Sequence, residues 1–393
     1  MISLKNSLKL IQVEIIITSA LISMPIMVPF YNSIGMDQGQ IGLSQTIFTL
    51  ALLVLNIPTG WIADRFSRKM CNAVGDLGAV IALLFYSQAH CFVDVVVAEV
   101  IFGVSLAFSH GADNALTKAH TDLLDPGGKR NLFHRFNTTN AIWRPIAQIV
   151  ALTIGGIIGP ASYPFAIAIS GVPYFIGFIL SLLIREEGKR LVSQHKNPFR
   201  DMWRVVRETV IPNVKLRWLI VAFAAGGSIT HVMIWALTPM MIAAGLPMTV
   251  VGAGWVLNAI ASMLGAMIAK RYAMRLAKWK RFAIPAIAII AALVIMTINL
   301  SVVTVWLYAV LGASYGWYTG VLIAMLQNEI PDQNQSTGLS IAGTFSQLIY
   351  APLVWLVSWA GNIDIRYSMV ATIVVFAPIM FITARKLKRL ENK

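Results

Sequence analysis

Charged residues are scarce in this sequence. They make up 12% of its 393 residues, whereas soluble globular domains contain about 25%. Hydrophobic residues make up 57% of the chain, and the mean hydropathy is +0.72. This composition excludes water as the main solvent of the chain.

Cysteine is almost absent, and so are the motifs of several enzyme classes. Cys71 and Cys91 are expected at opposite ends of one helix, too far apart for a disulfide bond. The sequence contains no P-loop pattern G-x-x-x-x-G-K-[ST], no cluster of metal ligands and no nucleophilic triad. These absences argue against an ATP-driven pump and against a membrane enzyme, and no cofactor is expected.

Long apolar segments recur along the chain. Each has about 18 residues or more and is long enough to cross a hydrocarbon layer of about 30 Å. They predict an all-α integral membrane protein with twelve transmembrane helices. The segments are 8–31, 40–62, 70–89, 95–118, 136–159, 164–184, 218–242, 248–269, 282–300, 303–326, 338–360 and 367–384. The first is longer than the apolar part of a signal peptide, so we expect it to remain as a helix.

The positions of the basic residues predict the orientation of these helices. The net charge is +14, and a cytoplasmic amino terminus places all but two of the 31 Lys and Arg residues on the cytoplasmic side. The exceptions are Arg144, within the fifth segment, and Arg366, in an outer loop. This distribution follows the positive-inside rule and predicts a multi-pass protein of a bacterial inner membrane with both termini in the cytoplasm. The basic residues then contact anionic lipid headgroups, and no nucleic-acid partner is expected.

One long hydrophilic segment divides the helices into two sets of six. Residues 185–217 are rich in Lys and Arg and contain Pro198 and Pro212. We predict an N-terminal six-helix bundle at 1–184, a cytoplasmic linker at 185–217 and a C-terminal six-helix bundle at 218–393. We expect the chain to act as a monomer.

A charged loop between the second and third segments resembles the signature of a known family. Residues 60–69 read GWIADRFSRK. They resemble the loop G-x-x-x-D-R-x-G-R-[KR] of the major facilitator superfamily, with Ser67 in place of the second glycine. The matching residues are Gly60, Asp64, Arg65, Arg68 and Lys69.

This resemblance implies the major facilitator fold, in which two pseudo-symmetric six-helix bundles give alternating access to a central site. It also implies that the loop is a conformational latch, with Asp64 near the cytoplasmic start of helix 11 in one conformation. A negative charge there is stabilised by the helix dipole. The second half carries AMIAKR at 266–271, where Lys270 replaces the acid. No equivalent latch is therefore expected in the second half.

Ionisable residues within the predicted helices are few, and nearly all lie in the first half. A charged group inside a bilayer is costly, so each one needs a partner, a hydrated cavity or a function. The residues are Glu14, Asp76, Glu99, His110, Asp113 and Arg144 in the first half and His231 in the second. The charge chemistry therefore belongs to the first half.

The fourth segment carries the most informative pattern. A spacing of 7, 4, 3 and 4 residues places five of its side chains on one face of a helix. They are Glu99, Leu106, His110, Asp113 and Thr117. The family resemblance assigns helices 1, 4, 7 and 10 to the wall of the central cavity. The residues that it places there are Glu14, His110, Asp113 and His231.

Two acids and an arginine are predicted to form the coupling site. Glu14, Asp113 and Arg144 lie at similar depths, and Arg144 is within reach of Asp113. Burial disfavours a charged carboxylate and a nearby cation favours it, so a proton competes with the cation or the substrate for the acid. We expect Asp113 to carry the coupling proton, with Glu14 as second candidate. Arg144 is then a counter-ion or an anchor for an anionic substrate, and the alternative is a permanent ion bridge with Asp113.

Polar and aromatic side chains in the helices are predicted to bind substrate. With Arg144, they are His110, His231, Trp235 and Asn258. A hydrogen-bonded packing role is the alternative for His231. Glu99 lies four residues before Gly103, at the position where helix 4 of many drug-transporting relatives has an arginine. Glu99 either has a function there or is only an interfacial group near the outer surface.

Two substrate classes compete within transport. Residues 107–116, AFSHGADNAL, resemble helix 4 of bacterial drug-efflux-like members of the family, which implies proton-coupled efflux of amphiphilic compounds. Residues 155–160, GGIIGP, are similar to the antiporter motif of helix 5, although Gly159 and Pro160 are expected simply to end the helix. Arg144 and the nearby histidine instead favour an anionic metabolite such as a carboxylate siderophore. A non-transporting membrane sensor or a channel is the alternative of another class.

Overall fold

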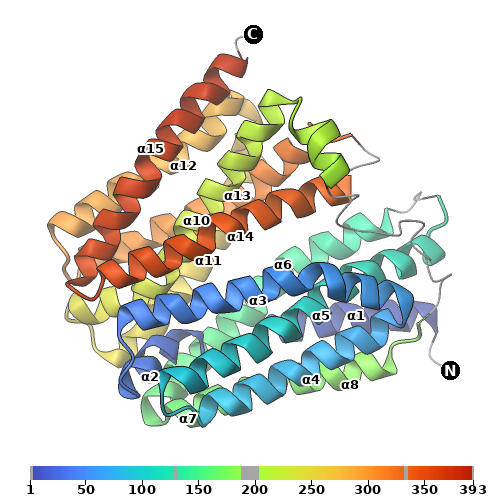
Figure 1. Cartoon of the computed structure of the whole chain (residues 1–393), viewed down its shortest axis with the longest axis horizontal. Coiled ribbons are helices and arrows are strands. Elements are labelled where there is room, and N and C mark those ends of the chain that lie inside the picture. The colour runs from blue at the N-terminus through green and yellow to red at the C-terminus, as the bar shows by residue number, and fades with distance from the viewer. Residues whose placement is uncertain (1–2, 128–130, 187–202, 332–334, 392–393) are drawn as a thin grey trace. The chain divides into compact units, whose positions relative to one another are not determined.

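The chain is helical throughout the described part of the computed structural model (Figure 1), which comprises residues 3–127, 131–186, 203–331 and 335–391. No strand occurs in these ranges. The prediction of an all-α protein is confirmed.

The chain forms two compact units. Unit 1 comprises Met1–Gly35 and Ile47–Pro198, and unit 2 comprises Met36–Thr46 and Phe199–Lys393. The main helices up to the linker are α1 (Leu4–Thr18), α2 (Met27–Ser33), α3 (Gln38–Arg65), α4 (Arg68–Ser87), α5 (Phe92–Leu124), α6 (Leu132–Ile158), α7 (Tyr163–Ile169) and α8 (Gly171–Leu183). Those after it are α10 (Val214–Ala243), α11 (Met248–Tyr272), α12 (Lys278–Ile298), α13 (Tyr308–Gln327), α14 (Gln335–Ala360) and α15 (Ile365–Glu391). The first residues of α3 are grouped with unit 2.

The two units repeat one pattern of helix contacts. In unit 1, α1 packs against α5, α6 and α8, and α4 packs against α5 and α8. In unit 2, α10 packs against α13, α14 and α15, and α12 packs against α13 and α15. The helices at corresponding places in the two series therefore make corresponding contacts. Such an internal repeat is typical of secondary transporters.

The first predicted crossing is broken. Helix α1 ends at Thr18, and a 3-10 turn at Met24–Ile26 precedes α2. Pro25 lies at the start of this turn, a position where the missing N–H of proline costs no intrahelical hydrogen bond. Eleven other described helices are long and apolar enough to cross a membrane.

Glycines of α6 allow close contact with the broken segment. A Cβ atom on Gly155 would collide with the carbonyl oxygen of Ile22, and one on Gly159 would collide with the side chain of Ile26. Helix α6 ends at Ile158, as predicted, and Gly159–Ala161 form a 3-10 turn. The GGIIGP segment therefore serves both helix termination and close packing.

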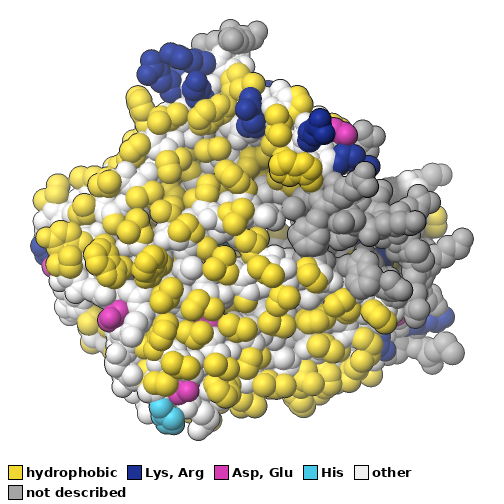
Figure 2. All heavy atoms as spheres, viewed as in Figure 1, with side chains coloured by type: hydrophobic (Ala, Val, Ile, Leu, Met, Phe, Trp, Pro, Cys, Tyr) yellow, Lys and Arg dark blue, Asp and Glu magenta, His cyan; other side chains and the backbone are white. Residues whose placement is uncertain are grey.

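The exposed surface is largely apolar, as a hydrocarbon solvent requires. Figure 2 shows hydrophobic side chains over most of the visible face, with Lys and Arg gathered near the C-terminal end of the chain. The side chains of Ile157, Ile287 and Phe381 are 72%, 69% and 67% exposed. In an aqueous protein such exposure would be costly, and in a bilayer these side chains contact lipid.

Helices α11 and α13 pack through glycine. A Cβ atom on Gly316 would collide with the backbone of Ser262, and one on Gly265 would collide with the backbone of Ala313. Close backbone approach at small residues is the main source of helix association in lipid, where the hydrophobic effect between helices is absent. This contact is therefore a sensitive point of unit 2.

Gly316→Ala is expected to lower the melting temperature of the purified protein in detergent. The added methyl group forces the two helices apart, at a cost of about 1–3 kcal/mol. Gly320→Ala is the matched control, because a Cβ atom there meets nothing within 4 Å. Alanine is the better helix former by about 1 kcal/mol, so the control is expected to melt at the same or a higher temperature. Equal changes in both variants would contradict the close contact.

Candidate functional site

Three carboxyl groups meet inside unit 1. Glu14 lies on α1, Asp76 on α4 and Asp113 on α5, and we call these residues the acid cluster. The helices pack directly on one another or on shared neighbours, so their inward side chains converge. Glu14 and Asp76 are 0% and 1% exposed. The carboxyl group of Glu14 is close enough to those of Asp76 and Asp113 to interact electrostatically with both.

The acid cluster has few hydrogen-bond donors. Among the described residues, no hydrogen-bond donor reaches either carboxyl oxygen of Glu14 or Oδ1 of Asp113. Asn72 lies beside Glu14 but directs its Nδ2 to Ser181 Oγ at 3.1 Å, and Ser181 Oγ donates to Asp76 Oδ2 at 3.3 Å. Two ionised carboxylates cannot bond to each other, because neither has a hydrogen to donate. A proton held between Glu14 and Asp113 fits this geometry.

One cation acts on the acid cluster. Arg144 of α6 interacts electrostatically with Asp113 and with Tyr174 of α8. No direct ion pair joins Arg144 to Asp113 in the part of the chain that the structure describes, and the Arg144 side chain is exposed. Three ionised carboxylates beside one guanidinium would leave a net negative charge in a buried site, which is costly. Binding of protons removes that cost.

The sequence predicted part of this arrangement. Glu14, Asp113 and Arg144 are brought together as expected, whereas the permanent ion bridge between Asp113 and Arg144 is not present. Asp76 and Asn72 were given no role by the sequence analysis. Their spacing of four residues places them on one helix face, and this signal would have found them. The side chain of His110 lies outside the described part of the structure.

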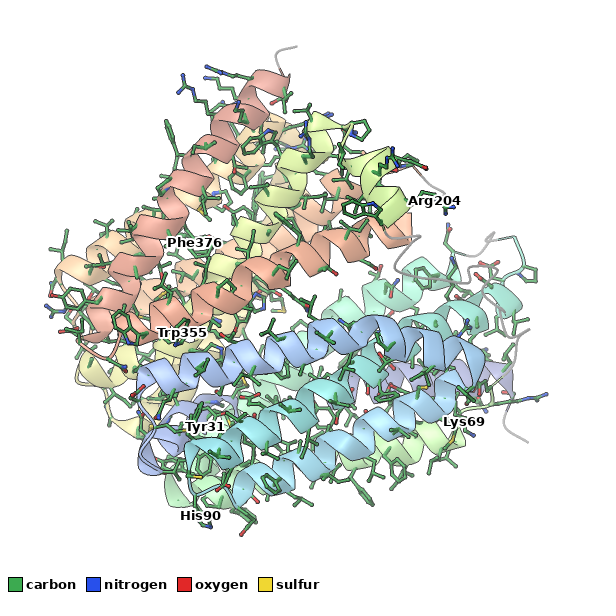
Figure 3. The ribbon with its side chains drawn as sticks, viewed as in Figure 1. Tyr31, Lys69, His90, Arg204, Trp355 and Phe376 are labelled. Atoms are coloured by element: carbon green, nitrogen blue, oxygen red, sulfur yellow. The ribbon has the colours of Figure 1, made fainter. Side chains whose placement is uncertain are left out.

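Glu99 lies at the other end of α5, beside two tyrosines. It is 3% exposed and accepts a hydrogen bond of 3.3 Å from the hydroxyl group of Tyr31. The rings of Tyr31 and Tyr86 lie 6.5 Å apart, and both are buried. Figure 3 shows Tyr31 and His90 at one end of unit 1 and Lys69 at the opposite end. Glu99 is therefore buried within unit 1.

Four ring side chains meet in unit 2, and we call them the aromatic cluster. The His231 ring lies 5.0 Å from that of Tyr315 and 6.2 Å from that of Tyr350, nearly perpendicular to both. Trp235 donates a hydrogen bond of 3.1 Å from Nε1 to the hydroxyl group of Tyr350. The predicted residues His231 and Trp235 thus belong to one site, built from α10, α13 and α14.

Asn258, also predicted to bind substrate, lies in a different place. A Cβ atom on Gly312 would collide with its Oδ1, which puts the amide in the contact between α11 and α13. Oδ1 is buried and has no hydrogen-bond partner among the described residues. The substrate-binding role of Asn258 stays a prediction.

The signature loop, residues 60–69, ends in a capped helix. The side chains of Gly60, Asp64 and Arg65 lie outside the described part of the structure, so the latch stays a prediction. Ser67 caps α4 by accepting a hydrogen bond of 3.1 Å from the backbone N–H of Met70. Its backbone is extended, with φ −163°, so no glycine is required at this position. The departure from the family pattern therefore supplies a helix cap.

An acid from the last helix of each unit completes such a cap. The Glu186 carboxylate, just after α8, accepts a hydrogen bond of 2.7 Å from the backbone N–H of Arg68 and another from the hydroxyl group of Ser67. In unit 2, Glu391 at the end of α15 accepts a bond of 2.8 Å from the backbone N–H of Lys278, at the start of α12. In each unit, a carboxylate at the end of the sixth crossing thus caps the N-terminus of the third crossing. The helix dipole favours negative charge at this end of a helix.

Glu186→Gln and Glu391→Gln are each expected to lower the melting temperature. Either change removes the negative charge from a helix N-terminus, at a cost of about 1 kcal/mol or less for an exposed carboxylate. Glu208→Gln, an exposed glutamate of the linker region, is the control and is expected to melt like the unaltered protein. The repeat in the structure predicts similar shifts for the first two variants. A shift in neither would show that the caps add no stability.

Solved structures of transporters share the fold of the whole chain. The nucleoside transporter NupG matches with a TM-score of 0.76 and 13% identity, over 99% of both chains. A D-xylose–proton symporter matches with a TM-score of 0.78 and 11% identity, over 98% of this chain and 97% of its own. A bacterial homologue of the human lysosomal transporter Spinster, in an inward-facing and unoccupied conformation, matches with a TM-score of 0.74 and 15% identity, over 98% and 97%. At these identities the likeness shows the fold alone.

Sequence comparison reaches the same family. No curated protein matches the chain significantly. The model of the family described as Major Facilitator Superfamily matches residues 15–353, which is most of the chain. Together with the two repeated six-helix units, this match identifies a transporter and not an enzyme. The chain belongs to the major facilitator superfamily.

Proposed function

We propose that this chain is a proton-coupled secondary transporter that exports amphiphilic compounds across a bacterial inner membrane, with both termini in the cytoplasm. The observation that carries the proposal is the pair of Glu14 and Asp113, whose carboxyl groups approach each other without a donor between them. A proton is the smallest ligand that removes both the repulsion and the unsatisfied oxygens.

Coupling follows from the electrostatics of the acid cluster. When the Glu14–Asp113 pair holds a proton, Arg144 acts on fewer negative charges. When the proton leaves, the guanidinium is drawn towards Asp113, or the pair attracts a cationic group of the substrate. A substrate and a proton that compete for one carboxyl group exchange across the membrane as the units alternate access. The D-xylose–proton symporter shows that this fold supports coupling to protons.

Amphiphilic substrates are supported by the contrast between the two units. Unit 1 offers the acid cluster, which suits a cationic or hydrogen-bonding group. Unit 2 offers the aromatic cluster, which suits an apolar ring. The resemblance of residues 107–116 to drug-efflux-like members supports export as the direction.

Transport of an anionic metabolite is the second candidate, and one observation favours it. The Arg144 side chain is exposed and makes no direct ion pair with Asp113 among the described residues. A guanidinium in this state is available to a carboxylate or phosphate group, which it binds in a bidentate manner. Arg144 would then anchor the substrate instead of balancing Asp113.

Asp113→Asn is expected to abolish uphill transport. The variant cannot release a proton at this position, so exchange of substrate continues while coupling is lost. Proteoliposomes with an acidic lumen and external ethidium provide the measurement. The unaltered protein is expected to accumulate ethidium above its external concentration, and the variant is expected only to equilibrate it.

Asp122→Asn is the matched control for this experiment. Asp122 lies on the same helix, α5, but is exposed near its end. It is expected to retain uphill accumulation. Full uphill accumulation by Asp113→Asn would remove Asp113 from the coupling step, and failure of the unaltered protein to respond to the proton gradient would overturn proton coupling to ethidium export.

Citrate separates the two substrate classes at Arg144. If Arg144 anchors an anion, citrate stabilises the folded, unaltered protein by about 2.7 kcal/mol at a concentration 100 times its dissociation constant. This stabilisation raises the melting temperature. Arg144→Gln then abolishes the shift. The export proposal instead predicts no citrate-dependent shift in either protein. A shift that is lost in Arg144→Gln would therefore favour the second candidate.

A further inference from the structure

His231 presents one ring nitrogen to the surroundings of α10. Its Nδ1 lies 3.0 Å from the backbone carbonyl oxygen of Gly227, one helical turn earlier. A carbonyl oxygen only accepts hydrogen bonds, so Nδ1 carries the hydrogen. In the neutral ring Nε2 is then a hydrogen-bond acceptor, and the described residues provide it with no donor.

The exposure of His231 is unusual for its helix. Most residues of α10 are buried, yet the His231 side chain is exposed. A histidine that only fills space between helices would be buried with both nitrogens satisfied, as His120 is. The His120 ring is 0% exposed, with Nδ1 at 2.9 Å from the Leu116 carbonyl oxygen, which accepts, and Nε2 at 3.2 Å from the hydroxyl oxygen of Ser7, which carries a hydrogen to donate.

Open space adjoins the aromatic cluster on two helices. Gly227 lies on the same face of α10 as His231, and a Cβ atom there would meet only Ser346 Oγ, at 3.8 Å. Gly343 lies two turns before Tyr350 on α14, and a Cβ atom there would meet nothing within 4 Å. Open space thus lies one turn before His231 on α10 and two turns before Tyr350 on α14.

The helices around this space are uncharged at the level of the cluster. Helices α13 and α14 contain no charged residue, and the charged residues of α10, Lys215 and Arg217, lie in its first turn. These walls therefore favour a neutral ligand group. The walls favour a flat ring, because aromatic side chains bind rings by stacked or edge-to-face contacts. The Nε2 acceptor favours a ring with a hydrogen to donate.

We propose that the aromatic cluster binds a neutral heteroaromatic ring of the substrate, and that an N–H or O–H group of this ring donates a hydrogen bond to His231 Nε2. This assignment rests on the proposed transport function and adds the substrate class that unit 2 recognises. His231 is then the specificity-determining residue, with Tyr315 and Tyr350 as the walls of the ring site.

Chemical modification tests the exposed nitrogen without any ligand. Diethylpyrocarbonate acylates unprotonated imidazole nitrogens that it can reach, and mass spectrometry locates the modified histidines. In the purified full-length protein, His231 is expected to react at least about tenfold faster than His120, the buried internal control. Equal and slow reaction of both residues would show that Nε2 of His231 is not accessible and would overturn the proposal.

Two pairs of ring compounds test the recognition. Theophylline and 8-hydroxyquinoline have a hydrogen to donate, and in caffeine and 8-methoxyquinoline a methyl group replaces it. The donor-bearing member of at least one pair is expected to slow modification of His231, and its methylated partner to protect roughly three- to tenfold less well, the range that one hydrogen bond provides. Equal protection within both pairs, or protection by none of the four compounds, contradicts the proposed ring site.

Gly343→Leu provides a second, independent variant. The leucine side chain enters the open space beside Tyr350 without a clash at Cβ, so the variant is expected to fold and to lose protection by the donor-bearing rings. Gly320→Leu is the control, because a Cβ atom there also meets nothing within 4 Å and Gly320 lies on a different face of α13 from Tyr315. In this variant the donor-bearing rings are expected to protect His231 as in the unaltered protein. Unchanged protection in Gly343→Leu would argue against this location. All of these measurements are made without a proton gradient, so their outcome is separate from that of the coupling experiment.

Discussion

Hydrocarbon offers no hydrogen bonds and no charge screening, and this constraint decides where polar chemistry is placed in the molecule. The described helices expose apolar side chains, and four acids within the spans lie beside other polar groups. Glu14, Asp76 and Asp113 share one interior site, while Glu99 lies beside Tyr31 and Tyr86. Each of these four acids thus has a polar neighbour.

The repeat gives the two units one framework and different contents. The same helix contacts occur in both, and an acid caps the third crossing in both, through Glu186 in one and Glu391 in the other. The interiors differ, because unit 1 contains acids and an arginine and unit 2 contains rings and no charge at the corresponding level. An internal duplication accounts for the common framework, and we propose that the difference in contents assigns proton binding to unit 1 and binding of a neutral aromatic ring to unit 2.

Hydropathy predicted the fold well because it reports the solvent of each segment. It placed the crossings, but it missed the break after Thr18, since the residues around Pro25 are as apolar as their neighbours. Hydropathy does not predict which side chains of different helices contact each other. The family resemblance assigned no cavity role to the third crossing, so Asp76 was left without a function, and the proximity of the Asn258 amide to Gly312 was not foreseen. Helical spacing gives the face of a residue but not the helix that it meets.

The number of charges in unit 1 argues for a mobile proton rather than a fixed ion bridge. A permanent bridge needs one acid for one arginine in direct contact, and unit 1 has three acids around an arginine that contacts none of them among the described residues. Ionising all three would bury a net negative charge, and binding of a proton reduces that charge. States in which the acid cluster holds at least one proton are therefore favoured. A site whose favoured states differ by a proton is one that a substrate or a change of access is able to switch.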